Sequence, residues 1–479
     1  MTSPKFNPAF LEPDERARRF AGRAHDLAEL LRAVRENTAR DHNQHVLVLG
    51  PRGMGKTTLL LRAADVVREK EAAWFPIVAP EELYQAGSLG EVWLELVLQL
   101  AVATGDDRHQ RAYTALRTER DDTRLAAAAL THLLDFADSR HCRLLLVLEN
   151  LHMLFGEQLD AQDAWAFREV LLHEKRIMVL ASAVTAFSGL RQPDAALYEL
   201  FLLHPLEPLD AEGSMALWQA ATGSEIPARR LRALELLTGG SPRLLAILAD
   251  SAAHRPLPEL TRELTDLLDA HTDYLKMTTE ALPAMERKVF VSLAQLWEEA
   301  TAAKVAEEAR LDLNVVSAQL ARLESRGFVL SRRQGRGKAY RLAERLYGLY
   351  HLLRRHSGAS ARAKEAVAFM ASYYENERPA LQAKALGEGA EAAMGQFRHQ
   401  ALNPGQAPWK MVGPALRLAS AGFGQEVLEA LLVSPQASHL EPLLVALRKH
   451  LQQEVRAPEL IEAVAEDLLQ DLRRLATPP

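Results

Sequence analysis

The chain has 479 residues, of which 48% are hydrophobic and 25% are charged, as is ordinary for a globular protein of several domains. Its formal net charge of −6 excludes a chain that is basic throughout, as a uniform nucleic-acid coat would be. The single cysteine, Cys142, excludes an intramolecular disulfide, and no run of about 18 apolar residues occurs, so we expect a cytoplasmic protein without a signal peptide or membrane span.

The N-terminal residues predict an arm followed by the start of a folded core. Three prolines in residues 1–15 favour a flexible arm. We place an α/β core at residues 16–209. Its first feature is a turn at Gly22 and Arg23, which precedes an amphipathic helix that runs to about Asn37.

The strongest motif begins where a strand predicted at His45–Leu49 meets a glycine-rich turn. The segment fits G-x-x-x-x-G-K-[ST], in which glycines let backbone N–H groups surround phosphate oxygens. Lys56 would neutralise the β- and γ-phosphates, and the Thr57 hydroxyl would bind Mg²⁺. Because a strand precedes the turn and a helix follows it, the motif predicts a nucleotide-phosphate site rather than a turn without function. The residues expected to hold the phosphates are Gly50, Pro51, Arg52, Gly53, Met54, Gly55, Lys56, Thr57 and Thr58.

Two further buried strands are predicted, and each ends in polar residues. The apolar run Cys142–Leu148 leads into Glu149 and Asn150. A P-loop enzyme needs a carboxylate near this position to hold Mg²⁺, so Glu149 is the candidate; the alternative is an acid that only keeps the strand end soluble. In the strand Arg176–Ala183, Ser182 either contacts the γ-phosphate or attacking water, or is an ordinary strand-end serine.

Residues 210–280 predict a helical lid. Within it, a Gly-Gly-Ser-Pro turn opens a helix that carries Arg243 near its start. A helix N-terminus with an arginine suits a phosphate, so Arg243 is a candidate lid arginine; the alternative is a capped helix with a surface arginine.

Residues 281–356 predict two helices, a turn, a third helix and a hairpin, which is the plan of a winged helix. From Pro283 to His356 there are 14 Lys and Arg against 8 Asp and Glu, so this segment has a net charge of +6 and the remainder has −12. Such asymmetry favours contact with double-stranded DNA, although winged helices also serve as protein-contact modules. The residues expected to contact DNA are Asn314, Ser317, Gln319, Arg322, Arg332, Arg333, Arg336 and Lys338.

Residues 357–479 predict an all-α region. Helical stretches separated by glycine and proline fit a helical-hairpin repeat or, as we prefer, an ordinary helical bundle. This region is a possible binding site for a protein partner.

The order of these motifs resembles the archaeal-type ATPases of the STAND group, which are similar to the origin-recognition initiator ATPases of the AAA+ class. The turn at Phe20–Arg23 resembles their adenine-side motif, Glu149–Phe155 resembles their acidic strand-end run, and Gly239–Arg243 resembles their lid motif with a sensor arginine. The resemblance implies a mostly helical protein with an α/β P-loop ATPase core, a parallel sheet with flanking helices, a helical lid, a winged helix and a C-terminal all-α region. It also implies bound ATP and Mg²⁺ and homo-oligomer formation on ATP binding, with Gly22 and Arg23 near the nucleotide.

One departure from that family concerns catalysis. Where the family has Asp-Glu, this chain has Glu149-Asn150, and an amide cannot accept the proton of an attacking water. Lys56, Glu149, Asn150, Ser182 and Arg243 remain the candidate catalytic residues. We therefore expect slow conversion of ATP to ADP by a DNA-contacting switch or assembly ATPase, in genome defence or mobile-element biology. The alternatives are a signalling scaffold with protein partners and an inert nucleotide-binding protein.

Overall fold

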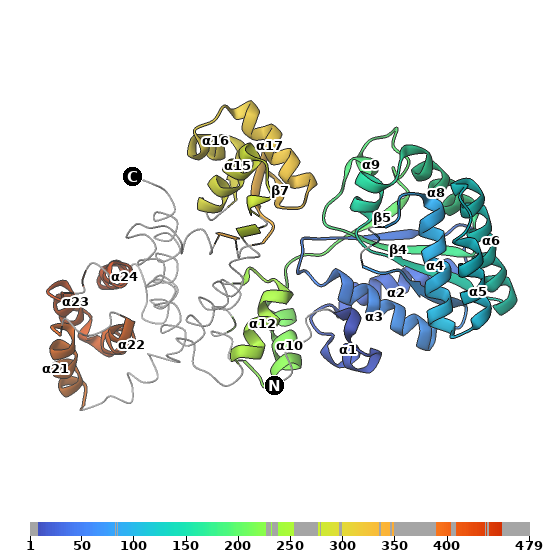
Figure 1. The fold of residues 1–479 in the computed structure, drawn as a ribbon. Helices are drawn as coiled ribbons and strands as arrows, with labels where there is room; N and C mark the ends of the chain where they lie inside the picture. Colours follow the sequence, from blue (N-terminus) through green and yellow to red (C-terminus); the bar gives the residue numbers. More distant parts are fainter. Residues whose placement is uncertain are drawn as a thin grey trace. The chain divides into compact units, whose positions relative to one another are not determined.

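The computed structural model describes residues 8–81, 83, 85–226, 231, 238–252, 276–277, 279–296, 299–334, 337–344, 347–348, 389–403, 409–435, 437 and 440–452. These residues belong to two compact units (Figure 1). The first comprises the chain up to Gly223 together with Ser241–Arg243 and Ser325–Gly327, and the second comprises the remainder.

The first unit is built on a five-stranded parallel sheet with the strand order β2-β3-β4-β1-β5. The parallel sheet with flanking helices confirms the predicted fold class. Pro76 lies in β2, an edge strand, where the missing N–H removes no hydrogen bond of a central ladder. The strands are β1 (His45–Leu49), β2 (Trp74–Val78), β3 (Arg143–Leu148), β4 (Ile177–Ala183) and β5 (Phe201–Pro205).

Helices cover both faces of this sheet and enclose two apolar cores (Figure 1). Along a strand, successive side chains point to opposite faces, so Leu144 and Leu146 enter one core while Leu145 enters the other. The first core also contains residues of α4, α6 and α8, and the second contains residues of α2 and α3. The helices of this unit include α2 (Ala24–Thr38), α3 (Lys56–Lys70), α4 (Leu89–Thr104), α5 (Asp107–Leu116), α6 (Asp122–Arg140), α8 (Ala161–His173), α9 (Ser188–Arg191) and α10 (Ala211–Thr222).

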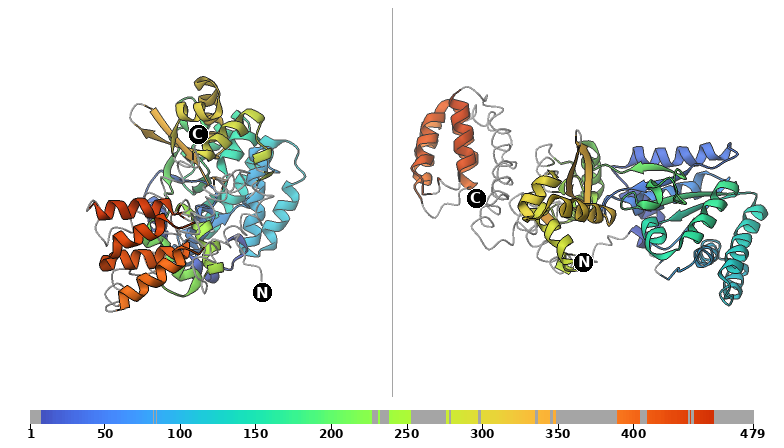
Figure 2. Two further views of the ribbon diagram at one scale, coloured as in Figure 1. Left: turned by 90° about the vertical axis from the view of Figure 1, so that its left-hand side faces the viewer. Right: turned by 90° about the horizontal axis from the view of Figure 1, so that it is seen from above.

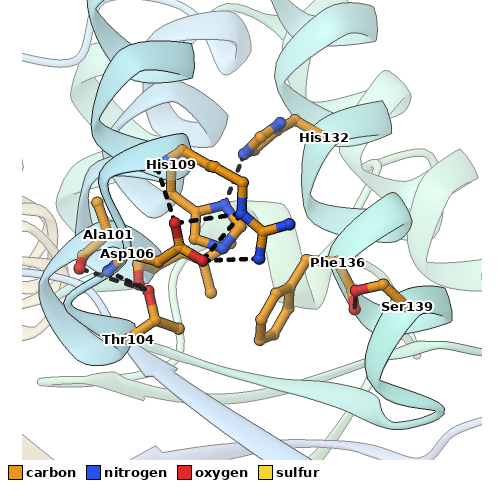
Figure 3. A network of polar contacts seen from close by, with 9 residues as sticks. Ala101, Thr104, Asp106, His109, His132, Phe136 and Ser139 are labelled. Atoms are coloured by element: carbon orange, nitrogen blue, oxygen red, sulfur yellow. Dashed lines mark hydrogen bonds and ion pairs between the residues drawn. The ribbon is translucent and has the colours of Figure 1, made fainter.

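The segment between α4 and α6 is rich in Asp, Arg and Glu, which predicts a solvated loop or helix end, but the structure has helix α5 there. Helix α4 ends at Gly105, whose φ of 63° is left-handed, and Asp106 then caps α5 by accepting a hydrogen bond from the Arg108 N–H at 2.9 Å. His109 turns inward, where its Nδ1 lies 2.9 Å from Nε2 of His132 on α6 (Figure 3). The high charge of this segment gave no sign of an inward face, on which His109 is buried and Ala112, Tyr113 and Leu116 pack against the core.

The prediction of a flexible arm at residues 1–15 is wrong for those of its residues that the structure describes. Pro8–Phe10 form a 3-10 helix, η1, and Pro13–Arg19 form helix α1. Arg16 attaches α1 to the core, because its Nε donates to Oδ2 of Asp65 on α3 at 2.7 Å. Both side chains are almost fully buried, at 8% and 3% exposed. Proline at the start of a helix favours α1 rather than disorder, because the missing N–H would have no partner there.

We expect Arg16→Met to lower the free energy of unfolding of the core by about 3 kcal/mol, because it leaves Asp65 buried without its closest partner. Arg68, whose Nη1 lies 3.7 Å from Asp65, remains and limits the loss. The double variant Arg16→Met/Asp65→Leu should recover most of the stability, since it removes both charges. Hydrogen exchange of the α3 amides measures the effect, and equal losses in the single and double variants would contradict this account.

His45 at the start of β1 is buried, with 1% of its surface exposed. Its Nδ1 accepts a hydrogen bond from the Val179 N–H at 3.1 Å, so Nε2 carries the proton and donates to the Leu171 carbonyl at 3.1 Å. Burial lowers the pKa of His45 from 6.5 to about 4. The ring is therefore neutral and joins β1, β4 and α8.

Because the folded pKa of His45 lies below the unfolded value, the unfolded chain binds the extra proton as the pH falls. The stability from the neutral ring is complete above about pH 6.5 and is lost toward pH 4, by roughly 3 kcal/mol for this shift. His45→Gln does not titrate, so its free energy of unfolding should depend less on pH over this window. Hydrogen exchange of the β1 amides measures these free energies of unfolding. If they change equally with pH in the two proteins, the neutral ring of His45 is not their cause.

The second unit contains the elements of the positively charged segment. In chain order they are α15 (Ala284–Gln295), β6 (Ala300–Thr301), α16 (Ala302–Ala309), α17 (Leu313–Ser325), β7 (Val329–Gln334) and β8 (Gly337–Leu342). The three strands form one antiparallel sheet with the order β6-β8-β7. The helices and the hairpin lie where the sequence predicts them, and the interpretation as a winged helix stays a prediction.

The C-terminal elements that the structure describes are helical (Figure 2). They are α21 (Ala390–Ala401), α22 (Trp409–Leu418), the π-helix η4 (Ala419–Phe423), α23 (Gly424–Leu432) and α24 (Glu441–Leu451). The helices predicted at Ala361–Glu375 and Pro458–Leu475 lie outside the described residues. Of the proposed lid, α10 belongs to the first unit, and α12 (Pro242–Ala252) is the other helix with described bounds. Among the described residues, no helix is both long enough and apolar enough to span a membrane.

Candidate functional site

The loop between β1 and α3 has the backbone that its glycines predict. Gly53 and Gly55 have φ values of 81° and 88°, in the left-handed region that glycine adopts readily. A Cβ on Gly53 would also lie 3.2 Å from Cβ of Arg243, whereas Gly55 has open space beside it. At the start of the loop, the Gly50 N–H donates to the Ala183 carbonyl at 3.2 Å. These contacts hold the loop against the ends of β1 and β4.

Lys56 is the first residue of α3, and its side chain turns back over the loop. Its Nζ donates to the carbonyls of Gly50 at 2.6 Å and Pro51 at 3.0 Å, and the residue is 8% exposed. The ammonium group and the N-terminus of α3 thus bring positive charge to the same loop, which favours an anion there. Arg52 is exposed, Met54 is buried, and Thr58 is half-buried.

Thr57 and Glu149 meet although they are far apart in the sequence. The Thr57 hydroxyl donates to Oε2 of Glu149 at 2.5 Å. Burial raises the pKa of Glu149 to about 7, the charge of Glu81 adds to the rise, and Lys56 and the hydroxyls of Thr57 and Ser182 oppose it. A hydroxyl and a carboxylate are hard oxygen donors, and Mg²⁺ commonly takes one or two such protein ligands together with phosphates and waters. The pair therefore fits the predicted metal site.

Asn150 and Ser182 shape the backbone next to that acid. Asn150 has a left-handed φ of 52°, its side-chain amide donates to the Glu81 carbonyl at 3.0 Å, and its backbone N–H donates to Oγ of Ser182 at 3.3 Å. Ser182 is 0% exposed, and its hydroxyl lies 3.5 Å from Oε2 of Glu149. The structure therefore places Ser182 against Glu149 and Asn150, where it positions the acid.

The structure places Arg23 against the backbone of the phosphate loop. Its Nη2 donates to the carbonyls of Met54 at 3.2 Å and Glu207 at 2.7 Å. Gly22 beside it has a φ of 73°, and a Cβ there would lie 2.7 Å from the Gly213 carbonyl oxygen. Arg23 thus ties the loop to the segment that follows β5, a contact that sequence spacing alone does not reveal.

Arg243, the candidate lid arginine, lies next to the same loop. Its backbone N–H donates to the Gly53 carbonyl at 3.1 Å, and its side chain is exposed. Both residues belong to the first compact unit. The contact brings the start of α12 to the phosphate loop, and the role of Arg243 toward a nucleotide stays a prediction.

His152 is a residue of this site that the sequence did not single out. It lies in the short helix α7 (Leu151–Met153), directly after Glu149 and Asn150. Burial, and then the positive charges of Lys56 and Arg52, lower the pKa of His152 to about 4. The available signal was its place in the acidic strand-end run, three residues after Glu149.

The predicted DNA-contacting residues divide by exposure. The prediction for Gln319 is wrong, because its side chain is 9% exposed and lies on the same stripe of α17 as Val316, Leu320 and Leu323. Asn314, Arg322, Arg332, Arg333 and Lys338 are exposed, Ser317 is half-buried, and Arg336 lies outside the described residues.

Two of the basic hairpin residues predicted to contact DNA have acidic neighbours. Nη2 of Arg332 lies 2.7 Å from Oε2 of Glu299, and Nζ of Lys338 lies 3.2 Å from Oε2 of Glu324. The pair of Arg332 and Glu299 lies at the surface, where an ion pair contributes little to stability, whereas Glu324 is buried. Both acids reduce the positive charge that the hairpin presents.

Comparison with known proteins gives a family match over part of the chain. Residues 19–180 match the family described as "AAA ATPase domain". A search of curated proteins found no match. Similar solved structures include the Walker-type ATPase paby2304 of Pyrococcus abyssi, with 12% identity, coverage of 69% of this chain and 95% of that chain, and a TM-score of 0.49. They also include the ORC1 protein of Aeropyrum pernix in complex with DNA (14% identity, 70% and 93% coverage, TM-score 0.40) and Cdc6p from Pyrobaculum aerophilum (15%, 68% and 92%, 0.36).

Proposed function

We propose that this chain, whose residues 19–180 form an AAA ATPase domain, is a slowly hydrolysing, ATP-dependent switch that contacts DNA. The observation that carries the proposal is the assembled pair of Thr57 and Glu149, whose oxygens lie 2.5 Å apart beside Lys56. A P-loop lysine next to a hydroxyl and a carboxylate forms a site for a nucleotide triphosphate and Mg²⁺.

Each group of the site has a separate task toward the nucleotide. Lys56 neutralises phosphate charge, and the backbone N–H groups of the loop donate to the phosphate oxygens. Thr57 and Glu149 would hold Mg²⁺, which neutralises charge on the β- and γ-phosphates when it is bound. Ser182 and the backbone N–H of Asn150 position Glu149 for that task.

Slow hydrolysis follows from the chemistry of Asn150. Its amide accepts no proton at neutral pH, and its Nδ2 already donates to the Glu81 carbonyl. General-base help is typically worth about 10²–10⁴-fold, so we expect turnover well below the roughly 1–100 per second of kinases. A bound ATP would then persist long enough to hold one conformation or assembly, which suits a switch.

The positively charged segment supports contact with double-stranded DNA. The exposed Asn314 and Arg322 lie on α17, which would be the recognition helix of a winged helix, and Arg333 lies on the hairpin. DNA phosphates can replace Glu299, the partly exposed acid that now pairs with Arg332.

We expect Arg332→Ala/Arg333→Ala to weaken binding to a short DNA duplex and to reduce the salt dependence of binding. Each lost phosphate contact lowers the slope of log K against log salt by about 0.9. Fluorescence anisotropy at several salt concentrations measures the slope. Arg124→Ala is the matched control, since that side chain is 77% exposed but lies on α6. No duplex affinity in the wild type, or equal slopes in all three proteins, would argue against this interface.

The second candidate is a signalling scaffold that assembles with proteins. The burial of Gln319 and the acidic partners of Arg332 and Lys338 favour it, because they leave a less basic surface than the sequence predicts. Light scattering coupled to size exclusion, with and without ATP and a duplex, separates the two. The switch forms a larger species that contains DNA, whereas the scaffold forms an ATP-dependent oligomer and leaves the duplex unbound.

A further inference from the structure

Two neighbouring carbonyl groups of the phosphate loop are held by donors that lie outside the loop. Nη2 of Arg23 donates to the Met54 carbonyl at 3.2 Å, and the Arg243 N–H donates to the Gly53 carbonyl at 3.1 Å. In a planar trans peptide the C=O and the N–H point in opposite directions, so a carbonyl held on one side turns the next N–H to the other side. Arg23 therefore sets the direction of the Gly55 N–H, an amide of the loop that is expected to surround a phosphate.

Arg23 is itself held by a chain of polar groups that ends on β5. Its Nη1 donates to Oδ2 of Asp26, in the first turn of α2, at 3.4 Å, and Oδ1 of Asp26 lies 2.8 Å from Nε2 of His204. Although burial opposes the change, His204 and Arg23 lower the pKa of Asp26. An ionised carboxylate only accepts hydrogen bonds, so Nε2 of His204 carries the proton. The side chains of Arg23, Asp26 and His204 are 8%, 18% and 17% exposed, so solvent screens their contacts little.

The stability of the fold does not by itself account for this arrangement. Within the described part of the chain, Nε of Arg23 is buried and has no hydrogen-bond partner, which costs free energy. Apolar side chains of similar volume often replace buried ion pairs without a loss of stability. An arginine that is kept at this cost beside an anion site favours a role in that site.

We propose that Asp26 and His204 are positioning residues for nucleotide binding, because they hold Arg23 where it turns the Gly55 N–H toward the phosphates. This inference rests on the proposed nucleotide site. Nη2 of Arg23 is shared between the Met54 carbonyl and the Glu207 carbonyl at 2.7 Å, so Arg23 acts on the nucleotide through the backbone of the loop.

Calorimetry on the full chain with Mg²⁺ and adenylyl imidodiphosphate tests the proposal. Arg23→Met keeps an unbranched stem without donors, and it should bind the analogue at least about tenfold more weakly because a loop amide loses its direction. His204→Leu should bind about threefold more weakly or worse. His204→Gln should recover most of that loss, since its Nε2 can donate in place of the imidazole Nε2. Adding His204→Leu or Asp26→Ala to Arg23→Met should have no further effect, because all three side chains act through one carbonyl.

Arg16→Met is the matched control for the loss of a buried arginine. Its closest partner is Asp65, which lies within α3 and outside the loop. This variant should melt at a lower temperature than the wild type and still bind the analogue as tightly.

Three outcomes overturn the role of this chain of polar groups. If Arg23→Met binds the analogue as tightly as Arg16→Met does, Arg23 does not orient the loop. If the losses in Arg23→Met and His204→Leu add, or if His204→Gln loses as much affinity as His204→Leu, His204 only supports the fold. Failure of the wild-type protein to bind the analogue would instead refute the proposed function, and this inference with it.

Discussion

Lys56→Ala will bind ATP about 10²–10⁴-fold more weakly than the wild type. The ammonium group can donate to oxygens of two phosphates, and a hydrogen bond to a charged group is worth about 1.5–3 kcal/mol, so two of them account for this range. The N-terminus of α3 and the loop amides remain in the variant and retain part of the affinity. Because Lys56 also donates to the carbonyls of Gly50 and Pro51, the free loop should become more mobile.

Titration calorimetry with Mg²⁺ and a non-hydrolysable ATP analogue measures this loss. Lys70→Ala is the matched control, because Lys70 is an exposed lysine at the other end of the same helix. The control should bind as the wild type does. If Lys56→Ala binds as tightly as the control, the phosphates do not lie at this loop.

Asn150→Glu will raise steady-state ATP turnover by about 10²–10⁴-fold, the usual contribution of a general base. The new carboxylate can accept the proton of an attacking water, which the amide cannot. Two effects lower the stability of this variant. The side chain can no longer donate to the Glu81 carbonyl, and a glutamate in the left-handed conformation costs roughly 1–2 kcal/mol. We therefore expect a protein that is somewhat less stable but faster.

Asn150→Gln is the control for size, since it has the length of glutamate without an ionisable group. Phosphate release at saturating Mg²⁺-ATP should then rise in Asn150→Glu only. Equal rates in the two variants would refute the assignment of position 150. A wild-type rate within roughly 1–100 per second would refute slow hydrolysis itself.

The helix that carries the positive segment shows where pattern reasoning loses precision. The bounds of α17 follow from the sequence, but polar type alone placed Gln319 on its outer face. Its position relative to Val316 and Leu323 puts it on the buried stripe, where an amide can be retained. Helix α5 shows the opposite error. Its charged residues predicted an exposed segment, whereas the structure has a helix that is capped by Asp106 and buries His109.

What the sequence by itself determined about this protein is local. Gly50–Thr58 are adjacent in the chain, so their backbone conformation, the glycine positions and the lysine at the helix start follow from short-range rules. The strands β1, β3 and β4 are also local, because a continuous apolar run between polar turns has few alternatives. These two features were enough to predict a P-loop core.

Only the tertiary structure decided which distant residues meet that loop. The order β2-β3-β4-β1-β5 brings the ends of β3 and β4 together beside β1, and this places Ser182 against Glu149. The same assembly ties Arg16 to Asp65 and Arg23 to Met54. Each contact depends on strand order, burial and side-chain direction, which arise only when separate segments pack, so no local pattern contains them.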